Sequence, residues 1–238
     1  MTPAEQLEYL RLLEEEERRR RYNLIDQLFP DTGPFRRELY RKHMEFFRAG
    51  AIHKERLFMA GNRVGKTIAG GGEMSYHLTG RYPEWWEGRR FSRAITALAA
   101  GDTSQTTRDI IQTKLLGGLW DTEDFGTGLI PRDTLGKPTP ARGVANLYEE
   151  IRVKHVTGHW SRLMLRSYDQ GRRIFQGTEQ DVVWLDEEVP KDVYDEALIR
   201  TMTTRGIVMM TFTPLSGLTE LVVSFLESMH DQEPVCPN

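Results

Sequence analysis

The 238-residue sequence has a single cysteine, no strong excess of either charge and no long apolar run. Cys236 has no partner for an internal disulfide, which excludes a disulfide-stabilised fold and favours a reducing, cytosolic compartment. Lys and Arg number 32 against 35 Asp and Glu, a net charge of −3, which argues against a histone-like nucleic-acid binder. No apolar run approaches the roughly 20 residues of a membrane span, and the charged start lacks the apolar core of a signal peptide. These absences do not exclude an enzyme that holds DNA through a local patch or as one subunit of a ring.

The first 50 residues are predicted to be helical. Residues 1–21 carry Leu7, Leu10 and Leu13 at helical spacing, and four Glu precede four Arg, an order that favours a helix through (i, i+4) pairs. The simplest interpretation is a solvated amphipathic helix, and the alternative is an arm that contacts DNA. After a break rich in Pro and Gly, a second helix is predicted over residues 36–49.

From residue 51 onward, short apolar runs alternate with helical patterns. Strands are predicted at residues 56–60, 94–102, 182–186 and 206–213, a hairpin at 151–156 and 162–168, and helices at 103–117 and 190–202. The helix at 103–117 would bury Ile110, Ile111 and Leu115, and residues 120–144 would form an irregular insertion. This alternation predicts an α/β fold with a mostly parallel sheet that is flanked by helices on both faces.

A phosphate-binding loop is predicted between the first strand and the helix that follows it. Its residues are Ala60, Gly61, Asn62, Arg63, Val64, Gly65, Lys66 and Thr67. The Gly-Lys-Thr end matches the P-loop pattern, although Ala60 stands at the first glycine position and the glycine comes one residue later. Backbone N–H groups and the helix N-terminus would hold the phosphates. Lys66 would contact the β- and γ-phosphates, and the Thr67 hydroxyl would ligate Mg²⁺.

Three consecutive glycines, at positions 70–72, lie within the predicted helix after this loop. Each costs up to about 1 kcal/mol in a helix interior. The sequence therefore predicts either close packing of this helix against the sheet or an early end of the helix.

The segment VVWLDEE, residues 182–188, places a carboxylate pair at the end of a buried strand. In open α/β sheets this edge binds ligands, so Asp186 would hold Mg²⁺ and Glu187 would act as the general base. The alternative is that the acidic pair caps the next helix. Glu188 is expected to cap or to face solvent.

The segment TFTP ends the last apolar run with Thr211, Phe212 and Thr213. Hydroxyls at the end of a strand beside Asp186 could sense whether the γ-phosphate is present. The alternative is the ordinary preference of threonine for strands.

Together with residues 167–178 (SYDQGRRIFQGT), these motifs resemble the large terminase subunit of tailed bacteriophages, the ATP-driven motor that packages DNA into procapsids. The resemblance covers about residues 40–218. It implies a P-loop NTPase core of the ASCE type, with an added strand between the two nucleotide motifs and an N-terminal helical appendage. It also implies that Glu187 and Arg63 are catalytic, that Arg63 senses phosphate, and that Thr211, Phe212 and Thr213 form a coupling motif.

The function implied by this resemblance is hydrolysis of ATP with Mg²⁺ to translocate double-stranded viral DNA. The implied partners are the DNA, the portal protein of the procapsid and the small terminase subunit, in the host-cell cytoplasm and without a membrane. The chain would be a monomer in solution and a homo-oligomeric ring when docked. We expect a helical segment at residues 1–50, an ATPase core at 51–238 and no nuclease domain, so that the chain is either a motor fragment or a natural short form.

Several assignments remain open at this level. Arg200 and Arg205 are candidates for an arginine that acts on a neighbouring subunit, as are Arg172 and Arg173. His43 stands where the family has an adenine-contacting glutamine, and a helix-surface histidine is the alternative. The competing functions are a helicase-like or regulatory P-loop NTPase and a nucleotide-dependent structural subunit.

Overall fold

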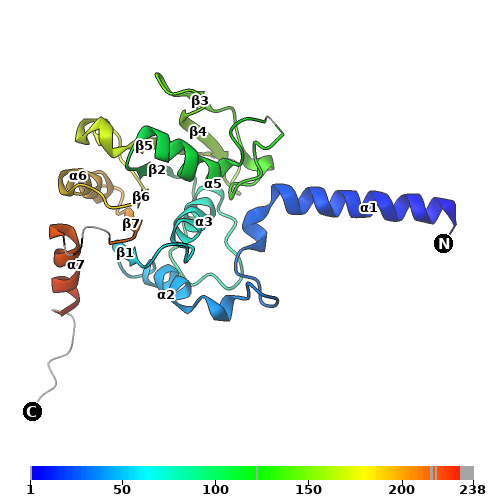
Figure 1. The fold of residues 1–238 in the computed structure, drawn as a ribbon, viewed down its shortest axis with the longest axis horizontal. Helices are drawn as coiled ribbons and strands as arrows, with labels where there is room; N and C mark the ends of the chain where they lie inside the picture. Colours follow the sequence, from blue (N-terminus) through cyan, green and yellow to red (C-terminus); the bar gives the residue numbers. More distant parts are fainter. Residues whose placement is uncertain (1, 122, 215–216, 218, 231–238) are drawn as a thin grey trace, which may run out of the picture.

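A seven-stranded sheet forms the centre of the computed structural model, which describes residues 2–121, 123–214, 217 and 219–230 (Figure 1). The strands are β1 (Glu55–Met59), β2 (Thr96–Gly101), β3 (Thr139–Pro140), β4 (Tyr148–Lys154), β5 (Trp160–Ser167), β6 (Val182–Asp186) and β7 (Ile207–Phe212). Their order across the sheet is β1-β7-β6-β2-β5-β4-β3. The first five in this order are parallel, while β4 and β3 pair antiparallel and extend one edge. The predicted parallel sheet and the predicted hairpin of β4 and β5 are therefore confirmed.

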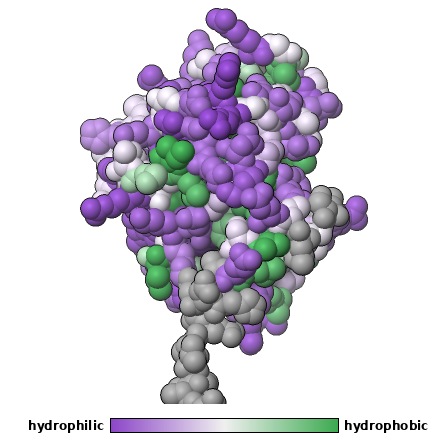
Figure 2. Space-filling view, turned by 90° about the vertical axis from the view of Figure 1, so that its left-hand side faces the viewer, coloured by the Kyte–Doolittle hydropathy of each residue, from purple (hydrophilic) through white to green (hydrophobic). Residues whose placement is uncertain are grey.

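Helices cover both faces of the parallel part of the sheet. The α-helices are α1 (Pro3–Tyr22), α2 (Arg41–Ala49), α3 (Lys66–Thr79), α4 (Ser104–Thr106), α5 (Thr113–Leu116), α6 (Lys191–Met202) and α7 (Glu220–His230). Helix α3 packs on one face of β6 and β7, and α6 packs on the other. Because β6 and β7 are buried on both faces, their sequences are continuous apolar runs rather than alternating ones. Figure 2 shows that the side formed by α6 and α7 is mostly hydrophilic, with small separate apolar areas.

Helix α1 projects away from the sheet as an appendage (Figure 1). None of its described residues is buried, and Leu7, Leu10 and Leu13 are 54%, 56% and 41% exposed. Ion pairs from Glu15 and Glu16 to arginines one turn later support the helix. At its end, Arg21 pairs with Asp124 of the body. The leucine spacing therefore predicts the helix correctly but marks no buried face.

Two predicted helices differ in detail from the structure. The second helix, α2, begins at Arg41 and follows a separate 3-10 turn at Arg37–Leu39. The segment after β2 contains a π-helix, Thr107–Gln112, between the short helices α4 and α5. A π turn holds more residues than an α turn and shifts the phase of the side chains. Ile111 and Leu115 are buried as predicted, whereas Ile110 is 38% exposed, so its predicted burial is wrong.

The three consecutive glycines lie inside α3, which continues to Thr79. An added Cβ would come within 2.4 Å of Trp184 Nε1 at Gly70 and within 2.8 Å of Leu129 Cδ1 at Gly71. Close packing against the sheet and the insertion therefore explains the glycines, and an early end of the helix is wrong.

A buried ion cluster fixes α3 to its neighbours. Arg56 of β1 donates from Nη2 to Glu73 Oε1 of α3 at 2.6 Å and from Nη1 to the Phe46 carbonyl of α2 at 2.7 Å. The second partner of Glu73, at 3.1 Å, is His77, whose pKa is lowered by burial. These contacts fix α2, β1 and α3 as one unit behind the loop at residues 60–65.

No helix among the described residues is both long and apolar enough to cross a membrane.

Candidate active site

The predicted site segments meet at the carboxyl edge of the parallel strands. The loop at residues 60–65 joins β1 to α3, Asp186 ends β6, and the segment from Thr211 ends β7. Strand β7 lies between β1 and β6, and Asp186 is the register partner of Thr211. The strand order therefore contains the added strand that the resemblance implies, at the edge where open α/β sheets bind ligands.

The backbone of the loop explains why its glycine can be displaced. Positive φ angles occur at Arg63 (61°) and at Gly65 (87°), which is the N-cap of α3. Neither Ala60 nor Gly61 has a positive φ, and a Cβ added at Gly61 would contact nothing within 4 Å. An alanine at position 60 therefore introduces no backbone strain.

Lys66 is buried at the centre of the site. Its Nζ donates to the carbonyl oxygens of Ala60 at 2.9 Å and Gly61 at 2.6 Å, and to Thr213 Oγ1 at 2.9 Å. The Thr213 hydroxyl in turn donates to Asn62 Oδ1 at 2.8 Å. An ammonium group has three donors, so all three protons of Lys66 are directed by the loop and by the end of β7.

Asp186 is 3% exposed and accepts hydrogen bonds from two hydroxyls. Thr211 Oγ1 lies 2.5 Å from Oδ1, and Thr67 Oγ1 lies 3.3 Å from Oδ2. Burial raises the pKa of Asp186 to about 6, the bond from Thr211 opposes this rise, and the neighbouring charge of Glu187 adds to it. A buried carboxylate beside a hydroxyl is an oxygen donor set that suits a hard divalent cation such as Mg²⁺.

The protein donors alone do not complete a metal site. Across the part of the chain that the structure describes, no group of three or more His, Cys, Asp or Glu side chains could hold an ion. Mg²⁺ typically binds through one or two protein ligands, with water and substrate phosphates supplying the rest. Thr67 and Asp186 fit this pattern.

Glu187 follows Asp186 in a left-handed backbone conformation, with φ of 69°. Its N–H donates to the Thr211 carbonyl at 2.9 Å. Such a conformation costs about 1–3 kcal/mol in a non-glycine residue and is found most often at functional sites. Glu187 lines a cleft of about 670 Å³ together with Glu188, Lys191 and Thr213. The capping alternative is wrong, because α6 begins at Lys191 with Pro190 as its N-cap and has no side-chain cap.

Only part of the predicted coupling motif faces the site. Thr211 and Thr213 contact Asp186 and Lys66, so their hydroxyls do more than favour a strand. Phe212 points to the opposite face of the sheet and is buried in the core cluster beneath α6 and α7.

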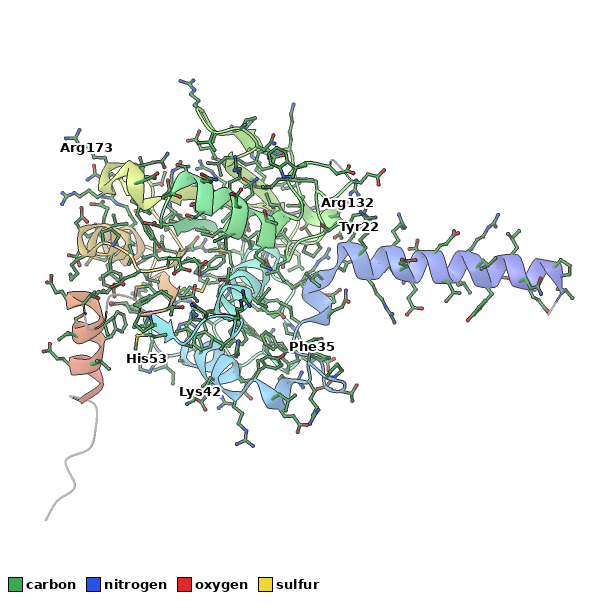
Figure 3. All side chains as sticks on the ribbon, in the orientation of Figure 1. Tyr22, Phe35, Lys42, His53, Arg132 and Arg173 are labelled. Atoms are coloured by element: carbon green, nitrogen blue, oxygen red, sulfur yellow. The ribbon has the colours of Figure 1, made fainter. Side chains whose placement is uncertain are left out.

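The candidate arginines lie in three places. Arg63 is exposed within the loop. Arg200 pairs with Glu196 near the end of α6, and Arg205 precedes β7, so both lie at the sheet edge opposite the site. Arg172 and Arg173 belong to a 3-10 turn after β5, and Arg173 points outward from the body (Figure 3).

His43 supports the loop from α2. It is 7% exposed, its ring lies 4.9 Å from the ring of Phe58, and its Nε2 lies 3.2 Å from the Cβ position of Gly65. Burial lowers the pKa of His43, while the polar backbone groups of Gly65 and Val64 oppose this change. The interpretation as a surface histidine is wrong, because this face of α2 packs on β1.

Two aromatic residues in the site were not predicted from the sequence. The Tyr168 hydroxyl, whose pKa is raised by burial, donates to the Asp186 carbonyl at 2.9 Å. Trp184 Nε1 donates to Thr211 Oγ1 at 2.7 Å. Tyr168 lies within the SYDQ segment and Trp184 within VVWLDEE. An aromatic side chain with a hydrogen-bond donor inside each motif was the sequence signal that could have indicated these contacts.

Comparison with known proteins identifies the family. The N-terminal family model of the T4likevirus-type terminase large subunit matches residues 57–234. The chain belongs to the terminase large subunit family. It is 34% identical over 252 residues to the terminase large subunit of Salmonella phage P22, an alignment that covers 99% of this chain and 49% of that protein. The chain thus spans about half the length of this relative.

A solved structure agrees on the fold of this terminase chain. The crystal structure of the HK97 bacteriophage large terminase matches with a TM-score of 0.57 and 13% identity, covering 87% of this chain and 40% of that one. The large terminase of a thermophilic bacteriophage, in complex with ADP, matches with a TM-score of 0.47 and 12% identity, covering 79% and 49%. The predicted α/β fold, with a mostly parallel sheet flanked by helices and an N-terminal helical appendage, is confirmed. The division of the chain into a helical segment at residues 1–50 and an ATPase core at 51–238 stays a prediction.

Proposed function

We propose that this chain binds ATP with Mg²⁺ and hydrolyses it as the motor domain that drives double-stranded viral DNA into a procapsid. The observation that carries the proposal is the meeting of Lys66, Asp186 and Thr213 at one sheet edge, within a chain of the terminase family. These residues come from three separate elements, and the first two match the phosphate and metal positions of P-loop NTPases.

Phosphate binding would fall to the loop and Lys66. The loop amides and the N-terminus of α3 favour anions, and Lys66 adds a positive charge that the loop carbonyls already orient. Thr67 and Asp186 would hold Mg²⁺, which would neutralise phosphate charge as the reaction proceeds. Arg63, exposed in the same loop, would approach the phosphates from the open side.

Glu187 would serve as the general base. Water adds to the γ-phosphorus, the bond to the ADP oxygen breaks, and the proton from the water passes to the Glu187 carboxylate. The backbone N–H of Glu187 is bonded to Thr211, so its position depends on the end of β7. Lys66 also donates to Thr213, the residue that follows β7, so the end of this strand would respond to the position of the phosphate-binding lysine.

The partners follow from the family. We infer that the chain acts on double-stranded viral DNA together with the portal protein of the procapsid and the small terminase subunit. It would be a ring when docked and a monomer in solution, in the host-cell cytoplasm. Arg200 and Arg205 lie opposite the chain's own site, a position that supports action on a neighbouring subunit rather than in cis.

The test is ATP hydrolysis in Mg²⁺, measured with and without linear double-stranded DNA and empty procapsids. We expect slow hydrolysis by the chain alone and faster hydrolysis when DNA and procapsids are both present. Hydrolysis that never responds to DNA would favour a nucleotide-dependent structural subunit. Equal stimulation by RNA or protein partners would favour the helicase-like or regulatory alternative.

A further inference from the structure

The indole of Trp184 occupies a fully buried position between the sheet and α3. Trp184, Asp186 and Thr211 are on the same face of β6 and β7, because Asp186 pairs with Thr211 and Trp184 lies two residues earlier on β6. The exposure of both Trp184 and Thr211 is 0%. Gly70 makes room for the ring, since a Cβ there would come within 2.4 Å of Nε1 and 2.5 Å of Cε2.

The two hydrogen bonds that link Trp184, Thr211 and Asp186 have only one possible direction of donation. An indole N–H donates and cannot accept, whereas a threonine hydroxyl has one proton and two lone pairs. Trp184 Nε1 lies 2.7 Å from Thr211 Oγ1, so this hydroxyl accepts from the indole. Its single proton then lies on the bond to Asp186 Oδ1, at 2.5 Å.

We propose that Trp184 is a positioning residue for the metal-binding carboxylate. Its N–H keeps the Thr211 hydroxyl aimed at Asp186 Oδ1. This bond holds the carboxylate in the rotamer that keeps both of its oxygens beside Thr67 for Mg²⁺, with Oδ1 3.4 Å and Oδ2 3.3 Å from Thr67 Oγ1. This inference rests on the proposed function, because it assigns the ion to Asp186 and Thr67. Residues that hydrogen-bond to a metal ligand orient it, and their loss typically costs about 10–100-fold in metal affinity.

The competing explanation is that Trp184 only fills space. The ring packs closely against α3 at Gly70 and lies 3.5 Å from the Cβ position of Gly71, and packing alone would account for a large buried side chain. The two roles depend on different parts of the residue: packing needs the ring, whereas positioning needs the N–H. A Trp184→Phe variant removes the N–H and keeps an aromatic ring.

The experiment is calorimetric titration of the chain with ADP, in Mg²⁺ and in EDTA. Trp184→Phe is expected to weaken ADP binding in Mg²⁺ by about three- to tenfold, the loss that corresponds to one neutral hydrogen bond, and to leave binding in EDTA unchanged. Thr211→Val should weaken ADP binding in Mg²⁺ by about 10–100-fold. Thr211→Ser keeps the hydroxyl, so its affinity for ADP in Mg²⁺ should stay close to that of the wild type. In the Thr211→Val background, Trp184→Phe should have no further effect, because contacting residues in one network are not additive.

Trp86→Phe is the matched control. Trp86 is also buried, at 3% exposed, and its Nε1 donates to the Arg89 carbonyl at 2.9 Å, away from the site. Loss of the Trp86 N–H should leave the Mg²⁺ dependence of ADP binding unchanged. If Trp184→Phe does not fold, β-(3-benzothienyl)alanine placed at position 184 keeps the bicyclic ring and lacks the N–H.

The outcomes separate the two proposals. Wild-type affinity for ADP that is equal in Mg²⁺ and EDTA would overturn the proposed metal site itself. A Mg²⁺-dependent wild type with Trp184→Phe indistinguishable from Trp86→Phe would overturn only the positioning role. Equal weakening of ADP binding by Trp184→Phe in Mg²⁺ and in EDTA would also overturn it, because that result indicates loss of packing.

Discussion

At the scale of single residues, Lys66 is the clearest test of the site. Its ammonium group donates to two loop carbonyls and to Thr213, so the loop and the end of β7 together orient the side chain. Lys66→Ala should abolish ATP hydrolysis and weaken ATP binding, while the thermal unfolding midpoint stays near wild type. Lys54→Ala, an exposed lysine just before β1, is the control and should change neither. Near wild-type turnover in Lys66→Ala would mean that the loop is not the active site.

Substitutions of the adjacent acids Asp186 and Glu187 should impair different steps, Mg²⁺-dependent binding for the first and turnover for the second. Glu187→Gln should keep ATP and Mg²⁺ binding and lower turnover by about 10²–10⁴-fold, the typical contribution of a general base. Asp186→Asn should weaken binding that depends on Mg²⁺, because the buried carboxylate is lost. Glu188→Gln, in the same cleft, should hydrolyse ATP at close to the wild-type rate. Nucleotide titrations and turnover assays on the three variants check these expectations. Equal loss of ATP binding in Glu187→Gln and Asp186→Asn would contradict the separate roles assigned to the two acids.

At the scale of elements, α3 and β6 are closer than side chains on both would allow. Gly70→Ala should gain up to about 1 kcal/mol of helix propensity, but its Cβ would collide with the Trp184 ring. Overpacking of this kind costs about 1–3 kcal/mol, so we expect a net fall in the free energy of unfolding. Urea denaturation measures this change, with Gly61→Ala as the control because its Cβ position is open. Equal stability of the two variants would show that α3 can move away from the sheet.

The sequence predicts the helices and strands better than it predicts the side-chain contacts between them. The apolar runs predict β1, β2, β6 and β7 because strands buried on both faces need continuous apolar residues. The burial of Ile110 is mispredicted because a π-helix changes the phase without any local signature. Trp184 was not placed in the site, and the sequence left His43 open between an adenine contact and a helix-surface position, because their contacts are with residues distant in the chain, Thr211 and Gly65.

At the scale of the whole molecule, the candidate arginines Arg200 and Arg205 lie at the sheet edge opposite the chain's own candidate site. An arginine supplied in trans can contribute about 10³–10⁵ in rate, and both residues are placed too far from the site of their own chain to act there in cis. We therefore expect a slow monomer whose turnover per chain rises with protein concentration or on docking to procapsids. Hydrolysis measured over a wide concentration range, beside sedimentation, checks this. A fast monomer with constant specific activity would remove the trans arginine from the mechanism.

The position of β7 also determines when the active site can come into existence during translation. Among the described strands, β1 pairs with β7 alone, and β7 separates it from β6. Residues 207–212 leave the ribosome after both of these neighbours, so β1 has no hydrogen-bonded partner among the described strands until β7 has been made. Thr67 and Asp186, 119 positions apart, reach each other only once this late strand has entered between them. In a nascent terminase chain the predicted phosphate-binding loop is therefore made well before the candidate active site can assemble, and β7, the last of the described strands to be synthesised, completes that site.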